Sequence, residues 1–164
     1  MLTSVPDLRI VRVGIDHPDA LLLIEAVQAE YVVRYGGRDE TPLDPPMFLD
    51  PRGAFYVGYV GPSPAATGAW RWHDPVAGVE AARCTEIKRM YVAAEHRRRG
   101  LARFMLAHLE SEARAAGSAA MILETGLRQP EAIELYASSG YLPIPGFGFY
   151  RNAPLSRCFA KPLA

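Results

Sequence analysis

One stretch of the sequence restricts the fold more than any other. A strand-like segment ending at Val92 leads through a basic turn into a long amphipathic segment that begins at Gly100. The turn carries three consecutive arginines, Arg97 to Arg99. The first turn of a helix has N–H groups without intrahelical partners and lies at the positive end of the helix dipole, so it attracts anions. Gly100 has no Cβ, which allows an anion to approach the backbone. The pattern therefore predicts a phosphate-binding turn between a strand and a helix.

The basic character of the chain is local. Over all 164 residues, 18 Lys and Arg balance 18 Asp and Glu. Between Arg83 and Arg103, however, seven basic residues face two acidic ones. This short cluster suits a small polyanionic ligand better than DNA, which usually requires a broader basic face. We therefore expect no nucleic-acid partner, although a nucleic-acid-binding role for the three arginines is an alternative that predicts strongly salt-dependent binding.

The length and composition are typical of one compact domain, expected over residues 1–164. The two cysteines, Cys84 and Cys158, lie in no CxxC pattern, so neither zinc nor redox chemistry is indicated and no metal site is expected. No apolar run reaches the length of a membrane span, and the first residues lack the apolar region of a signal peptide. We therefore expect a cytoplasmic protein without a membrane partner.

Apolar periodicity and turn residues predict the remaining elements. Strands are expected over residues 8–15, 54–60, 67–73, 82–92, 119–125, 141–142 and 155–161, and helices over residues 20–35, 101–116 and 130–139. The segment Gly36–Gly53 is rich in Pro, Gly and Asp, and its length is typical of functional or mobile segments; it is expected to contain one short helix near residues 46–49. The order of elements predicts an α/β (α+β) fold in which a mixed sheet is flanked by helices.

Two motifs in this order resemble those of a known family. Residues Arg97 to Ala102 fit the phosphate pattern (Arg or Gln)-x-x-Gly-x-(Gly or Ala), immediately after a strand and before an amphipathic helix. Residues Leu135 to Tyr141 read Leu-Tyr-x-x-x-Gly-Tyr, which resembles the family's second motif, and Gln129 stands where that motif commonly has Asn. Over nearly its whole length the chain resembles the GNAT superfamily of acetyl-CoA-dependent N-acetyltransferases.

The resemblance implies the GNAT-like acyl-CoA N-acyltransferase fold, with a mostly antiparallel sheet of six to seven strands. It also implies that acetyl-CoA is the acetyl donor. The strand residues Met90, Tyr91 and Val92 would bind the pantetheine arm, and the sheet would open beside a bulge near Arg89 and Met90. Backbone amides from Arg98 to Ala102 would hold the pyrophosphate, with the arginine side chains neutralising it. The implied cofactor-binding residues are Met90, Tyr91, Val92, Arg97, Arg98, Arg99, Gly100, Leu101, Ala102 and Gln129.

Acetyl transfer to an amine requires a base, because a lysine-type amine has a pKa of about 10.4 and is protonated at neutral pH. Glu86, on the strand that leads to the cofactor site, is the candidate base; the alternative is an ion pair with Lys88 or Arg89. Tyr136, the tyrosine of the second motif, is the candidate acid for the departing thiolate; the alternative is packing on the apolar face of its helix. His73 and Glu124 are reserve bases.

No Cys or Ser nucleophile motif is present, so direct attack by the amine in a ternary complex is expected. The acceptor is expected to be an amine, either a small molecule or a peptide, selected by residues 36–53 and 143–154. A non-catalytic acyl-CoA-binding sensor or partner module is the alternative function. The resemblance also allows a homodimer.

Overall fold

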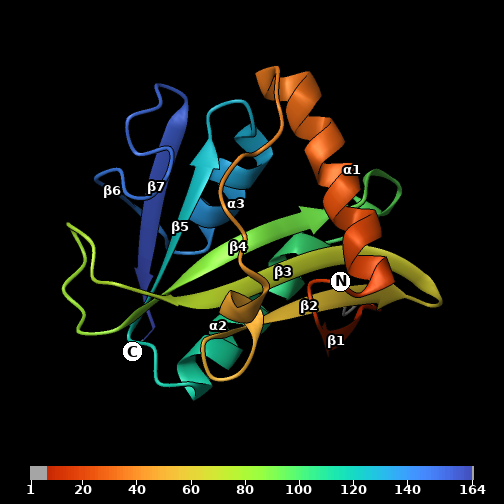
Figure 1. Cartoon of the computed structure of the whole chain (residues 1–164), viewed down its shortest axis with the longest axis horizontal. Coiled ribbons are helices and arrows are strands. Elements are labelled where there is room, and N and C mark those ends of the chain that lie inside the picture. Colours follow the sequence, from red (N-terminus) through yellow and green to blue (C-terminus); the bar gives the residue numbers. More distant parts are fainter. Residues whose placement is uncertain (1–6, 164) are drawn as a thin grey trace, which may run out of the picture.

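In the computed structural model, which describes residues 7–163, seven strands form one mixed sheet (Figure 1). The strands are β1 (Arg9–Val13), β2 (Gly53–Val60), β3 (Ser63–His73), β4 (Cys84–Val92), β5 (Ala120–Gly126), β6 (Leu142–Ile144) and β7 (Ser156–Pro162). The helices are α1 (Pro18–Tyr35), α2 (Leu101–Ala115) and α3 (Pro130–Ser138), with short 3₁₀ turns η1 (Pro45–Phe48) and η2 (Ala94–His96).

The strand order is β1-β2-β3-β4-β5-β7-β6, and each neighbouring pair is antiparallel except β4 and β5, which are parallel. This confirms the predicted mixed, mostly antiparallel sheet flanked by helices. The short helix expected near residues 46–49 is η1, one residue earlier. Strand β3 begins at Ser63 rather than residue 67, because Gly61 adopts φ 56° and the chain reverses within two residues.

The helices cover both faces of the sheet because the inner strands alternate apolar side chains between the faces. On β2, Phe55 and Val57 pack with α1 and η1, whereas Ala54 and Tyr56 pack on the other side with α2. Helix α3 belongs to the second layer, with Tyr136 in the same cluster as β5. Burial on two faces fixes the register of β2, since a slip by one residue would exchange the two sets of side chains.

The sheet opens between its two parallel strands. β4 and β5 pair over three positions, from Cys84–Ala120 to Glu86–Ile122, and Figure 1 shows the two strands diverging beyond this point. The register of β4 against β3 shifts at the same level, where Arg89 adopts φ 52°. Thr67 on β3 donates from Oγ1 to the Arg89 carbonyl at 2.7 Å. The structure thus contains the bulge expected near Arg89 and Met90.

Within residues 7–163, no helix combines the length and the apolar composition needed to cross a membrane. The same residues contain no group of three or more His, Cys, Asp or Glu side chains arranged to hold a metal ion.

Candidate active site

A cleft of about 530 Å³ lies where the sheet opens. We call it the β4 cleft: β4, α1, α3 and the turn before α2 line it. Nine of the ten predicted cofactor-binding residues line this cleft; the tenth, Arg99, is exposed and lies outside its lining. The nine are Met90, Tyr91, Val92, Arg97, Arg98, Gly100, Leu101, Ala102 and Gln129. The candidate acid Tyr136 also lines the cleft.

The turn before α2 has the backbone of an anion-binding site. Arg98 (φ 64°) and Gly100 (φ 76°) both adopt left-handed conformations, and glycine is the residue that does so without a steric cost. The amide of Phe104 donates to the Gly100 carbonyl at 3.1 Å, so the amides of the three preceding helical residues have no intrahelical partner. Backbone N–H groups in this kind of turn form a concave site for an anion.

The arginines of the turn differ in their contacts. Arg97 Nε donates to the Val92 carbonyl at 3.0 Å, and its Nη2 forms an ion pair with Glu30 of α1. Burial opposes the charged form of Arg97, but the Glu30 carboxylate outweighs this effect and raises the arginine pKa. Arg103 also lines the cleft, although the motif did not identify it; it donates to Ser138 and Ser139 at the end of α3. Arg97 thus ties the turn to α1, and Arg103 ties α2 to α3.

A second cavity of about 460 Å³ lies on the other side of the opening. We call it the β5 pocket: it is lined by the end of α1, the segment after it, the end of β5 and the loop before β7. Its polar side chains include Asp39, Glu40 and Glu124. Tyr31 and Gln129 line both the β4 cleft and the β5 pocket, so the two cavities meet at these residues.

Glu124 lines the β5 pocket, and its pKa lies near neutrality. Burial raises its pKa to about 7, and the nearby Glu86 and Asp39 carboxylates add to the shift, while Lys88 opposes it. A carboxylate with this pKa exchanges a proton at physiological pH, which is the property required of a general base. The sequence offered Glu124 as a reserve base; the signal that separates it from other glutamates is burial in a pocket.

Glu86 lies in a different environment. It is 3% exposed, and its Oε1 contacts Arg71 Nη2 at 2.7 Å and Nε at 3.0 Å, while Oε2 lies 3.4 Å from Lys88 Nζ. It is absent from the lining of both cavities. The reserve base His73 packs its ring against Phe147, with 5.3 Å between ring centroids, and also lies outside both linings. The structure therefore brings Glu124 and Tyr136, but not Glu86 or His73, to the two cavities.

Tyr136 is buried on α3 with its ring edge-on to Tyr141, at 5.6 Å between centroids. Burial raises the pKa of its hydroxyl above the ordinary value, and the nearby Tyr31 adds to this effect. The hydroxyl is therefore neutral at physiological pH and able to donate a hydrogen bond or a proton.

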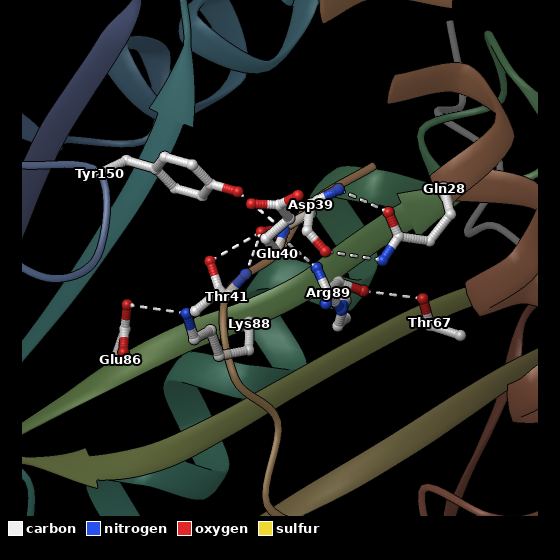
Figure 2. A network of polar contacts seen from close by, with 9 residues as sticks. All are labelled: Gln28, Asp39, Glu40, Thr41, Thr67, Glu86, Lys88, Arg89 and Tyr150. Atoms are coloured by element: carbon white, nitrogen blue, oxygen red, sulfur yellow. Dashed lines mark hydrogen bonds and ion pairs between the residues drawn. The ribbon is translucent and has the colours of Figure 1, made fainter. Parts of the chain in front are cut away.

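Asp39 fastens the segment after α1 to the bulge of β4 (Figure 2). Its carboxylate forms an ion pair with Arg89 and accepts hydrogen bonds from Thr41 N at 2.9 Å and Thr41 Oγ1 at 2.7 Å. The Gln28 side chain bonds both backbone groups of Asp39, at 2.8 Å and 3.2 Å. Glu40 N donates to the Tyr150 hydroxyl at 2.8 Å, which connects the segment to the loop before β7. These contacts hold one wall of the β5 pocket against the strand that lines the β4 cleft.

The sequence model of the Acetyltransferase (GNAT) family matches residues 22–141. The chain therefore belongs to the GNAT acetyltransferase family. The matched range contains the opened strand pair, the turn before α2 and α3, which provide much of the lining of the two cavities; the loop before β7 lies outside it.

Individual relatives agree with this assignment. An Azospirillum brasilense protein named IAA acetyltransferase is 44% identical over 78 residues, which are 48% of this chain and 51% of that protein. The chain thus spans about half the length of the curated relative it matches. A Klebsiella pneumoniae protein described as an acyl-CoA N-acyltransferase is 27% identical, with a TM-score of 0.76 over 96% of this chain and 98% of that one. A GNAT acetyltransferase from Elizabethkingia anophelis, solved with acetyl-CoA bound, has a TM-score of 0.63 at 14% identity, over 95% of this chain and 98% of that one.

Proposed function

We propose that this chain is an N-acetyltransferase, acting as a single domain, that transfers the acetyl group of acetyl-CoA to an amine by direct attack in a ternary complex. One observation carries the proposal: the β4 cleft and the β5 pocket meet at Tyr31 and Gln129. The β5 pocket contains Glu124, whose pKa is about 7, and the β4 cleft contains the turn before α2. This arrangement fits a reaction with a phosphate-bearing donor on one side and a protonated acceptor on the other.

The residues of the β4 cleft fit an acyl-CoA. The unpaired amides at the start of α2, with Arg98 and Arg103 beside them, match the charge of a pyrophosphate. Met90 and Val92 at the open side of β4 offer backbone groups to the amides of the pantetheine arm, as an added strand would use them. The structure of the Elizabethkingia anophelis relative with acetyl-CoA bound supports the same donor.

The proposed reaction follows from the placement of the two titratable groups. Glu124 accepts a proton from the bound amine, whose lone pair then adds to the carbonyl carbon of the thioester. The C=O electron pair moves to oxygen, and when it returns the C–S bond breaks. Tyr136 protonates the departing thiolate, and the second proton that the nitrogen must lose to become an amide returns to the Tyr136 oxygen. Glu86, the base favoured by the sequence, is the alternative, but its contacts with Arg71 and Lys88 favour a structural ion pair.

A pH profile separates the two carboxylates. In the wild type, kcat/KM should fall below about pH 7 as Glu124 becomes protonated. Glu124→Gln should lower turnover by about 10²- to 10⁴-fold and remove this acidic limb. Glu86→Gln is the matched control and should keep the limb. Loss of the limb in Glu86→Gln, with the limb retained in Glu124→Gln, would assign the base to Glu86.

Thiol release from acetyl-CoA should be measured with ethanolamine, 1,4-diaminobutane, glycine and a lysine peptide as acceptors. Binding of acetyl-CoA should be measured separately, as a shift in melting temperature. A ligand at about 100 times its dissociation constant adds about 2.7 kcal/mol of stability. Binding with turnover on one acceptor class supports the proposal and identifies that class. Binding without turnover on any acceptor favours the sensor or partner module instead. An absence of acetyl-CoA binding contradicts both.

A further inference from the structure

Among residues 7–163, Tyr31 and Gln129 are the two that line both the β4 cleft and the β5 pocket. If the first cavity holds the acetyl donor and the second holds the amine, the acetyl carbonyl has to lie at their junction, because the acetyl group passes from one to the other. This position of the carbonyl rests on the proposed function. A side chain at the junction then meets the negative charge that develops on the carbonyl oxygen during the reaction.

The tyrosine at the junction retains its proton. Burial raises the pKa of Tyr31 to about 12; the Arg89 guanidinium opposes this effect, and Asp39 and Tyr35 add to it. Gln129 also lines both cavities, and its side-chain oxygen accepts from the Tyr35 hydroxyl at 3.1 Å. A neutral phenol has one donor, so the Tyr31 proton is available to a ligand at the junction.

A buried cation also lies near the junction. Arg89 is buried beside Tyr31, and its Nε has no hydrogen-bond partner within the described part of the chain. Its Nη1 is held by Asp39, which fixes the guanidinium in place. A preorganised donor beside a fixed positive group stabilises a developing negative charge more than water does, because nothing has to reorient as the charge forms.

We propose that the Tyr31 hydroxyl is a further catalytic group of this enzyme, donating a hydrogen bond to the thioester oxygen as the amine adds. The N–C bond forms as the C=O electron pair moves to oxygen, where the Tyr31 proton stabilises it without being transferred. The electron pair returns when the C–S bond breaks.

The test is Tyr31→Phe, which keeps the ring and removes the donor. With acetyl-CoA and the best acceptor of the panel above, kcat should fall by about 10²-fold, while KM for both substrates stays within about threefold. The acidic limb near pH 7 should remain, because the base is intact. Tyr59→Phe is the matched control, since it removes a hydroxyl bonded to Asp19 outside both cavities and should leave kcat unchanged.

A Tyr31→Phe kcat within twofold of the wild type would overturn the proposal. So would a change confined to KM, which indicates binding of the ground state rather than the transition state. A loss of the acidic limb would also count against it, because the hydroxyl would then act through the base. Absence of turnover by the wild-type chain would refute the proposed function and, with it, this inference. Turnover by the wild type with an unchanged kcat in Tyr31→Phe would refute this inference alone.

Discussion

The ion pair between Asp39 and Arg89 provides the sharpest test of how the site is held together. Asp39→Asn keeps the shape of the side chain and an acceptor for Thr41, but leaves the Arg89 guanidinium without its counter-charge. Arg89 is 6% exposed at its side chain, and Asp39 is 19% exposed. Removing one partner of a fully buried pair costs about 3–5 kcal/mol. Because Asp39 is partly exposed, we expect a loss of about 2–3 kcal/mol in the free energy of unfolding.

For a chain of this length, 1 kcal/mol corresponds to a shift in melting temperature of about 2–4 °C, so Asp39→Asn should melt about 4–12 °C below the wild type at pH 7. Asp44→Asn is the matched control: Asp44 is exposed on the same segment, and its side chain makes no cap hydrogen bond. A loss below about 1 kcal/mol, or one equal to that of Asp44→Asn, would refute the reasoning.

The pH dependence of this difference has a defined sign. Burial disfavours the charged form of Asp39, but Arg89 and the Thr41 hydrogen bonds outweigh burial and hold its pKa below the ordinary value. A carboxyl with a lowered pKa stabilises the fold above its unfolded pKa, and this contribution is lost as the pH falls through the folded pKa. The difference in melting temperature between wild type and Asp39→Asn should therefore be constant near neutral pH and shrink below about pH 4. A constant difference down to pH 3 would contradict this assignment.

Two other substitutions probe the cavities. Tyr136→Phe should lower turnover while the thermal shift with acetyl-CoA stays near that of the wild type; unchanged turnover would remove Tyr136 from the mechanism. In Gly126→Ala, the added Cβ would lie 1.9 Å from the Tyr35 hydroxyl oxygen and 2.5 Å from the Tyr35 Cζ, in the wall of the β5 pocket. Because Tyr35 has to shift, the substitution should raise the acceptor KM severalfold and lower the free energy of unfolding by about 1–3 kcal/mol. Unaltered acceptor kinetics and melting temperature would show that Tyr35 moves freely.

The backbone of the turn before α2 could be predicted from the sequence because its determinants are local. A strand, a run of arginines and a glycine before an amphipathic helix specify the backbone over a few residues, and Gly100 occupies the left-handed position that favours glycine. The bulge near Arg89 was expected from the family resemblance, and the structure contains it. Even here the side chains differed from expectation: Arg99 lies outside the cleft, whereas Arg103 lines it.

The choice between Glu86 and Glu124 could not be made from the sequence. Both are strand glutamates in apolar surroundings, and the preference for Glu86 rested on its place on the cofactor strand. The two glutamates differ in the side chains that surround them in the folded structure. Glu86 forms an ion pair with Arg71 on the adjacent strand, and Glu124 lines the β5 pocket, where burial raises its pKa. The direction of a pKa shift depends on burial and on neighbouring charges, which no sequence pattern near the residue specifies.

By itself, the sequence determined the order of the elements, a mixed sheet flanked by helices and the backbone of the turn before α2, because these follow from short-range periodicity and from the backbone preferences of Gly and Pro. Only the tertiary structure decided the junction of Tyr31 with Gln129 and the pair of Asp39 with Arg89. These partners are far apart along the chain and meet because α1 packs on the sheet and the segment after it crosses β4 (Figure 1). A contact of this kind depends on how apolar faces pack across the sheet. The electrostatic interaction between the two side chains becomes strong only when both are buried together.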